Sequence, residues 1–245
     1  MRFKASSFAL LLAAMLAFAA SAGAVDGTIE INQAKVMAGS GFPFIISTPN
    51  SSYRLTGSLS VPAGVDGIDV TASNVTIDLN GFSITAPGNP GVTITGINAS
   101  FQSDVTVENG TATGFAVGIQ VGSVGIVRNM HADANGAGIS VGNNSVVAGC
   151  TANNSTILGA WGIICSGGSA ISGNTTNANN FYGIKCNGSG CLISGNTANS
   201  NGNEGIFAND STTGYGGNVL IANGVLPASG GTSMKNNVCT SGGLC

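Results

Sequence analysis

The stretch that decides the fold is GIICSGGSAISGNTTNANNFYGIKCNGSGCLISGNTANSNGNEGI (162–206). It contains two copies of one unit: a Gly-Ile pair, an apolar pair followed by Ser-Gly-Asn-Thr, and an Asn-rich turn. Working outward, Gly-Ile pairs begin at Gly67, Gly96, Gly118, Gly138, Gly162, Gly183 and Gly205, and the last five are spaced by 20, 24, 21 and 22 residues. A period of about 20–25 residues with two or three short strands is typical of a solenoid.

The second half of the unit recurs with the same period. It is found as VTVENG (105–110), IVRNM (126–130), VVAGCT (146–151), AISGNT (170–175) and LISGNT (192–197). Leucine-rich repeats need several leucines per unit and propeller blades need about 40 residues, which leaves an all-β parallel β-helix of about seven coils. Alternation of inward and outward side chains predicts one buried stack of Ile119, Ile139, Ile163, Ile184 and Ile206. It also predicts a ladder of Asn109, Asn129, Cys150, Asn174 and Asn196.

The composition agrees with many short strands joined by tight turns. The 245 residues include 39 Gly, and only 7% carry a formal charge, against roughly 25% in an ordinary soluble domain. A mean hydropathy of +0.34 argues against disorder. Seven basic residues and a net charge of −3 exclude a basic nucleic-acid-binding surface.

At its N-terminus the chain has the pattern of a secretory signal peptide. Arg2 and Lys4 precede an apolar run, and Ala22-Gly23-Ala24 supplies small residues for cleavage. Sixteen apolar residues are short for a membrane span of about 20, so we expect cleavage after Ala24 rather than an anchor. The mature chain is then predicted to carry no membrane span and to be secreted or periplasmic.

The chain resembles bacterial exported right-handed β-helix repeat proteins of the pectin-lyase-like superfamily. The residues that carry the resemblance are GTIEINQAKVMAG (27–39), YRLTGSLSVP (53–62), GIDVTASNVTIDLNGFSI (67–84) and the repeated GI…ISGNT coils. We predict a signal peptide at 1–24, an N-terminal cap with the first strands at 25–64, coils at 65–223 and a C-terminal cap at 224–245. The superfamily hosts lyases, hydrolases, depolymerases and adhesins, so the fold alone does not define an activity.

Six cysteines, Cys150, Cys165, Cys186, Cys191, Cys239 and Cys245, favour disulfides in an exported chain. Cys165 and Cys186 share an inward position on adjacent coils, so their Cα atoms should lie about 4.8 Å apart, a separation that suits a disulfide. Alternatively, Cys186 pairs with Cys191 and leaves Cys165 for Cys150. Cys239 and Cys245 are expected to close the terminal loop. With no Cys-x-x-Cys spacing and His131 as the sole histidine, we predict neither a metal nor a cofactor.

Catalysis by a lyase or hydrolase would need carboxylates on the outward face of one sheet. The outward residues after each Gly-Ile pair are Asp69, Asn98, Gln120, Ser140, Ile164, Lys185 and Phe207. Only Asp69 is acidic, and alternation places Asp66 on the other face about 10 Å away. The galacturonase signatures and the clustered aspartates of pectate lyases are absent from this sequence. We therefore expect no catalytic residues.

Two smaller groups of residues remain. Asp78, Glu108 and Arg128 are expected on successive coils near Asn129 and His131, where an ion pair between coils is favoured over an acid–base site. Trp161 and Tyr182 each precede a Gly-Ile pair, with Glu204 at the same place one coil later and Lys185 nearby. Stacked rings beside polar groups suit the apolar face of a sugar, although the same rings would also serve simply to cover the edge of the coil.

The sequence therefore predicts an exported, non-catalytic β-helix that binds glycan or another cell-envelope component through Trp161, Tyr182, Lys185 and Glu204. The alternatives are a polysaccharide lyase or hydrolase and a structural or adhesive surface protein. The sequence makes no prediction of oligomeric state.

Overall fold

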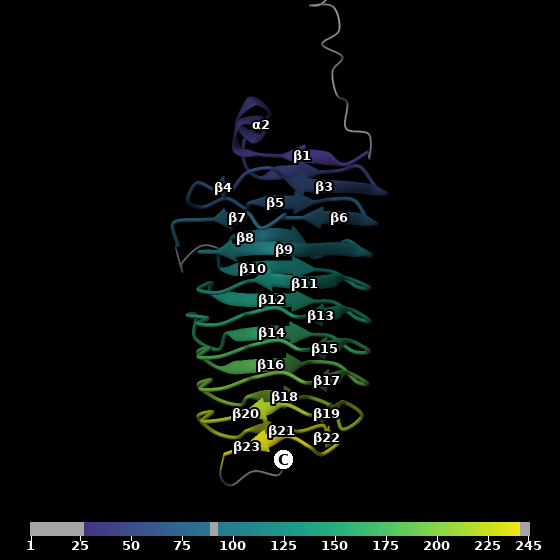
Figure 1. Ribbon diagram of the computed structural model, residues 1–245, viewed down its shortest axis with the longest axis vertical. Coiled ribbons are helices and arrows are strands. Elements are labelled where there is room, and N and C mark those ends of the chain that lie inside the picture. The colour runs from purple at the N-terminus through teal and green to yellow at the C-terminus, as the bar shows by residue number, and fades with distance from the viewer. Residues whose placement is uncertain (1–26, 89–92, 241–245) are drawn as a thin grey trace, which may run out of the picture.

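Successive turns of the chain contribute short strands to two long parallel sheets, so the turns stack into a rod (Figure 1). The computed structural model describes residues 27–88 and 93–240. The predicted signal peptide (1–24) and Cys245 lie outside these residues. The architecture is the predicted all-β parallel β-helix.

The larger sheet contains twelve of the described strands. Its main path is β1 (Ile29–Ile31), β3 (Ser51–Leu55), β6 (Val75–Asp78), β9 (Val105–Thr113), β11 (Ile126–His131), β13 (Val146–Ala148), β15 (Ala170–Ser172), β17 (Leu192–Ser194), β19 (Gly214–Gly216) and β22 (Thr232–Ser233). Beside it, β4 (Leu59–Ser60) pairs with β7 (Ser83–Thr85), which also pairs with β9.

The second sheet contains nine described strands, one per turn. They are β2 (Phe44–Ile46), β5 (Ile68–Val70), β8 (Thr95–Ala99), β10 (Val117–Val121), β12 (Ala137–Val141), β14 (Trp161–Cys165), β16 (Tyr182–Cys186), β18 (Ile206–Ala208) and β21 (Ala228–Ser229). A short pair, β20 (Val219–Leu220) and β23 (Val238–Cys239), lies near the C-terminal end.

The β-helix has about nine turns rather than the predicted seven. The difference arises at the ends, where the Gly-Ile period is absent but the strands still pair in register. Phe44 pairs with Ile68 at one end, and Ile206 pairs with Ala228 at the other. A short helix, α2 (Gln33–Ala38), lies at the N-terminal end of the stack and buries Val36 (Figure 1).

The interior is filled by columns of identical side chains. The predicted isoleucine stack is confirmed and extends further, with every member fully buried: Ile68, Ile97, Ile119, Ile139, Ile163, Ile184 and Ile206. Burial of each side chain contributes roughly 1.5–3 kcal/mol, so this column is a principal source of stability.

The glycine before each isoleucine marks a bend in the strand. A Cβ at Gly162 would lie 2.6 Å from the Ala152 carbonyl oxygen, and one at Gly183 would lie 2.6 Å from that of Gly205. Around this bend strict alternation fails: in β14, Gly162 and Ile163 are buried while Trp161 and Ile164 are both partly exposed. Residues three apart therefore share the outer face of this sheet.

The predicted asparagine ladder is wrong by one residue, because the structure divides it into two columns. Asn109 and Asn129 align with Gly149, since Glu108, Arg128 and Ala148 are register partners and His131 pairs with Thr151. This column has a left-handed backbone, with φ of 53–67° at Asn109, Asn129, Gly149, Gly173, Gly195 and Gly217. Asparagine and glycine tolerate this conformation best.

The neighbouring column holds the buried amides. Asn174 donates its backbone N–H to Asn196 Oδ1 at 2.9 Å, and Asn196 donates in the same way to Asn218. Their Nδ2 groups donate to backbone carbonyls of the preceding coil, at Val147 and Ile171, and to the next amide. Cys150 precedes this ladder and donates its N–H to Asn174 Oδ1 at 2.9 Å. A second ladder joins the buried Asn179 and Asn201 to the partly exposed Asn223.

Candidate functional site

The predicted binding residues lie together on the outer face of the nine-stranded sheet. Trp161 on β14 pairs with Tyr182 on β16, and Lys185 on β16 pairs with Phe207 on β18. The glycine bend brings Tyr182 and Lys185 to the same side of the strand, although they are three residues apart. We call Trp161, Tyr182, Lys185, Glu204 and Phe207 the aromatic patch.

Its centre is a pair of stacked rings. The centroids of Tyr182 and Phe207 are 5.0 Å apart with an interplanar angle of 29°, and Phe181 meets Tyr182 edge-on at 4.5 Å. Lys185 Nζ lies 5.2 Å from the Tyr182 centroid and 5.7 Å from that of Phe207. The ammonium group is therefore held by cation–π attraction over both rings.

Phe207 was not among the predicted binding residues. The signal was present in the sequence, because Phe207 follows Lys185 in the column of outward residues. What the sequence did not reveal was the bend that turns Tyr182 toward this column.

Glu204 lies in the same patch and is mostly buried, with 8% of its surface exposed. Its Oε1 accepts a hydrogen bond of 3.1 Å from Ser229 Oγ, while its buried Oε2 has no partner among the described residues. Burial, and then the Glu204 charge, raise the pKa of Tyr182. Tyr182 therefore remains a neutral phenol at physiological pH.

Trp161 borders a shallow depression of about 200 Å³. Val117, Ala137, Ile157 and Leu158 contribute apolar walls, and Leu158 is 89% exposed. The indole Nε1 is buried and has no hydrogen-bond partner among the described residues. The depression next to the patch is thus apolar, with one unused donor beside it.

Asp66 and Asp69 do not lie on opposite faces, as alternation predicted. Asp66 lies near enough to Asp69 for its charge and a side-chain hydrogen bond to act on the pKa of Asp69. Burial raises the pKa of Asp69, the Asp66 charge and hydrogen bond raise it further, and a hydrogen bond from Asn98 opposes the shift. Asp66 Oδ1 also accepts from the Thr95 backbone N–H at 2.6 Å.

On the twelve-stranded sheet, charged side chains form ion pairs between coils. Arg54 Nε lies 3.3 Å from Asp78 Oδ2, and Arg128 pairs with Glu108. His131 Nδ1 lies 2.9 Å from Thr151 Oγ1. The structure thus shows the expected ion pair between coils, and Arg54 adds a second.

The cysteines partly match the second of the two predicted arrangements. Cys186 and Cys191 form a disulfide across the turn within one coil, with Cα atoms 6.7 Å apart. The predicted Cys165–Cys186 bridge is wrong, and so is the Cys150–Cys165 alternative, because both Cys150 and Cys165 are free thiols. Burial raises the pKa of Cys165 to about 12 and that of Cys150 to about 11. Cys239 is disulfide-bonded.

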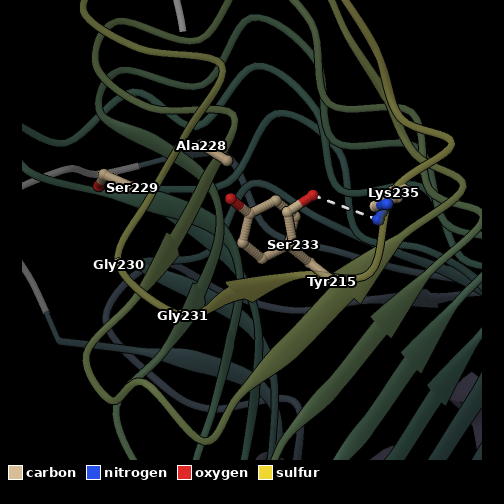
Figure 2. Close-up of a pocket in the computed structure, with 7 residues that line it drawn as sticks. All are labelled: Tyr215, Ala228, Ser229, Gly230, Gly231, Ser233 and Lys235. Carbon is tan, nitrogen blue, oxygen red and sulfur yellow. Dashed lines mark hydrogen bonds between the residues drawn. The ribbon is translucent and has the colours of Figure 1, made fainter. Parts of the chain in front are cut away.

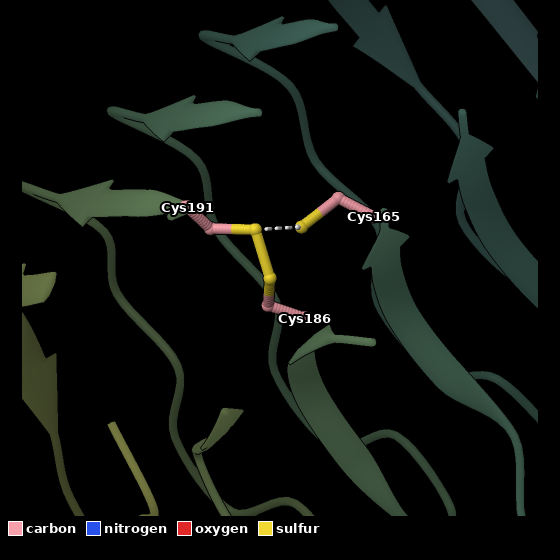
Figure 3. A group of neighbouring side chains, drawn as sticks. All are labelled: Cys165, Cys186 and Cys191. Carbon is pink, nitrogen blue, oxygen red and sulfur yellow. Dashed lines mark hydrogen bonds between the residues drawn. A yellow bond between two sulfur atoms is a disulfide. The ribbon is translucent and has the colours of Figure 1, made fainter. Parts of the chain in front are cut away.

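The Cys165 thiol nevertheless lies close to that bridge. Its sulfur lies 3.9 Å from that of Cys191, and all three sulfur atoms are within 4.8 Å of one another. Figure 3 shows the thiol pointing toward the bridge. An in-line attack on the disulfide would place the Cys165 and Cys186 sulfurs roughly 6 Å apart, given a bond of about 2.0 Å. Cys165 therefore lies beside the disulfide bond, in a position poorly suited to exchange.

A larger cavity of about 510 Å³ opens at the C-terminal end of the stack. Figure 2 shows Tyr215, Gly230, Gly231, Ser233 and Lys235 around it. The Lys235 backbone N–H donates to Ser233 Oγ at 3.3 Å. It lies beside the last strands of both sheets, so it belongs to the end of the rod rather than to the patch. None of the helices in the described part of the chain is long and apolar enough to cross a membrane.

No protein-family model matches the chain, and no curated protein matches its sequence. Among solved structures, the chain is similar to the crystal structure of Dettilon tailspike protein (gp208), with a TM-score of 0.53 and 18% identity. The match covers 74% of this chain and 41% of that protein, so this chain spans less than half of its length. At this identity the similarity concerns the fold, and it places the chain among parallel β-helix repeat proteins.

Proposed function

We propose that the protein is an exported, non-catalytic β-helix that binds glycan through the aromatic patch. The observation that carries this proposal is the stack of Tyr182 and Phe207, 5.0 Å apart on consecutive coils, with the Lys185 ammonium over both rings. Rings on adjacent coils offer an apolar surface to the face of a pyranose, and the ammonium offers donors to its oxygens.

The neighbouring groups support an extended ligand. The apolar depression beside Trp161 continues the patch toward the N-terminal coils. The outward column there consists of Ser140, Gln120 and Asn98, which supply hydroxyl and amide groups in register. A secretory signal pattern and a disulfide support an extracellular or periplasmic location.

The test begins with a glycan array probed with mature protein. Trp161 is the single tryptophan of the chain, so its fluorescence reports directly on titration of any glycan found. Calorimetry should show that Tyr182→Ala and Phe207→Ala each weaken binding by about 1–3 kcal/mol, a loss of roughly 5- to 150-fold. Phe101→Ala is the matched control, because Phe101 is 94% exposed and lies just after β8.

Two results would contradict the proposal. One is binding that survives the loss of both Tyr182 and Phe207. The other is a pair of variants that bind normally but melt much earlier than the wild type, which would assign the rings to packing. No binding to any glycan would favour the structural or adhesive alternative.

A hydrolase is the second candidate, because Asp69 has a raised pKa beside Asp66 on the same sheet face. Glycosidases place their two carboxyl groups about 5–9.5 Å apart to leave room for substrate or water. Asp66 instead acts on Asp69 as a hydrogen-bonding neighbour, which favours binding over cleavage. Release of reducing ends from a bound glycan, abolished by Asp69→Asn, would establish the hydrolase instead. An absorbance assay for unsaturated products on uronate polymers tests the lyase alternative.

A further inference from the structure

The side of the rod between the two main sheets carries a repeated Thr-x-Asn motif that the aromatic patch does not use. It is found at Thr151–Asn153, Thr175–Asn177 and Thr197–Asn199. The middle residues, Ala152, Thr176 and Ala198, are fully buried, while the threonines and asparagines are partly exposed. We call these three Thr-x-Asn rungs the threonine face.

The rungs are aligned from coil to coil. Thr151 pairs with Thr175, and Thr175 with Thr197, in parallel bridges. Neighbouring coils are spaced by about 4.8 Å, and residues two apart on a strand by roughly 6.6 Å. Threonine and asparagine side chains therefore form a two-dimensional array whose spacing is set by the backbone.

Hydrogen bonds hold this array in place. Asn153 Oδ1 accepts from the Asn177 backbone N–H at 2.6 Å, and Asn177 Oδ1 accepts from that of Asn199 at 2.9 Å. Asn199 Oδ1 accepts in turn from the Ile221 N–H at 2.8 Å. Each asparagine is thus fixed through its oxygen, and its amide nitrogen bonds to no other described residue. A ligand that meets this face encounters side chains that are already ordered.

The chemistry of the face is uniform and uncharged. Each threonine offers a methyl group beside a hydroxyl that can donate and accept, and those of Thr175 and Thr197 bond to no other described residue. Formal charge enters only at the preceding rung, where Asp133 accepts from Thr151 Oγ1 at 2.8 Å. The three rungs also contain no aromatic ring on which a sugar would pack.

We propose that the threonine face binds the surface of ice. A crystal face of ice is itself a flat, periodic array of oxygen atoms that donate and accept hydrogen bonds. A periodic array of hydroxyl and amide groups can replace those bonds, and the methyl groups release water from an apolar surface. The aligned backbone gives the array the regularity that a crystal surface requires.

The test uses the full mature chain and ice itself. We expect the wild type to separate the freezing point from the melting point of a seed crystal and to be incorporated into a slowly growing ice front. Thr175→Lys/Thr197→Lys introduces two long, hydrated charges into the array and should abolish both effects. Ser172→Lys/Ser194→Lys adds the same charges to β15 and β17 of the same coils and should leave both effects intact.

We expect each variant to fold, because all four positions are partly exposed. Circular dichroism melting of each variant checks this. Exclusion of the wild type from ice would overturn the proposal, as would equal incorporation of the threonine-face and control variants. Binding to crystalline cellulose or chitin through Thr175 and Thr197, without any effect on ice, would overturn it in favour of a polysaccharide surface.

Discussion

The same interior corner is filled by different chemistry in the two halves of the rod. In the N-terminal half it holds Met130, which is fully buried, and in the C-terminal half it holds Asn174, Asn196 and Asn218, which are buried to the same degree. Cys150 occupies this corner on the coil between those of Met130 and Asn174. Methionine needs only apolar contacts, whereas each asparagine needs an amide on the following coil to accept its N–H. An apolar corner is therefore self-sufficient, while an amide corner must be continued until a coil reaches solvent.

The largest effect is expected where both halves use the same chemistry. Ile163→Asp places a carboxylate in the middle of the isoleucine column, without a partner and away from water. We expect no soluble folded protein, measured as the yield of monomeric β-rich material after expression. The control Ile164→Asp changes the partly exposed neighbour and should express well.

A reciprocal exchange separates the two chemistries. Asn196→Met deprives the backbone N–H and Nδ2 of Asn174 of their acceptor, and each unsatisfied group costs about 1–3 kcal/mol. Met130→Asn buries an amide with no ladder around it, at a similar cost. Both variants should unfold at lower denaturant concentration than the wild type. An Asn196→Met variant as stable as the wild type would show that the amide ladder is dispensable.

The disulfide is expected to contribute less than the ladder. Cys186 and Cys191 close a short loop, and the loop-closure relation gives a stabilisation of about 2 kcal/mol. Cys186→Ser/Cys191→Ser should therefore lower the free energy of unfolding by about this amount, measured by chemical denaturation, and should leave the fold intact. Collapse of the C-terminal coils in this variant would mean that the cross-link, not the ladder, holds them together.

The smallest effect concerns pH and is confined to the N-terminal half. Because the folded-state pKa of Asp69 is raised, the stabilisation from its protonated form is present below the ordinary aspartate pKa and is lost as pH rises through the folded-state value. Asp69→Asn should remove this loss, so the melting temperature of the variant relative to that of the wild type should rise as the pH is raised above the ordinary aspartate pKa. A difference in melting temperature that does not change with pH would show that the pKa of Asp69 is not raised in the folded protein.

The sequence predicted the solenoid, the isoleucine column and the aligned outward residues, because the Gly-Ile period is read directly from residue spacing. It misplaced Asn109 and Asn129 in the asparagine ladder. The predicted ladder members follow the preceding isoleucine by 10 to 12 residues, and this spread hides an error of one residue in the alignment of the coils. One residue separates the column of turn residues with positive φ, which includes Asn109 and Asn129, from the column of buried amides.

The contacts between outward residues three apart could not be predicted by strict alternation. The bend at each glycine brings Asp66 onto the face of Asp69, and Tyr182 onto that of Lys185 and Phe207. At these glycines the backbone is too crowded for a side chain, since a Cβ at Gly183 would lie 2.6 Å from the Gly205 carbonyl oxygen on the next coil, and this crowding is a property of the stack and not of any single strand.

The amide ladder also makes the length of the rod adjustable. Residues 175–196 contain one full coil, including both cysteines of the disulfide. Excision of these 22 residues would bring the Asn174 N–H opposite Asn218 Oδ1 and Ile163 onto Ile206, so that no amide loses its acceptor and no cysteine loses its partner. Duplication of the same segment would add a coil by the same rule. Gain or loss of whole coils therefore conserves the amide ladder and the isoleucine column, and a lineage of such proteins can vary in length by recombination between repeats without designing a new core.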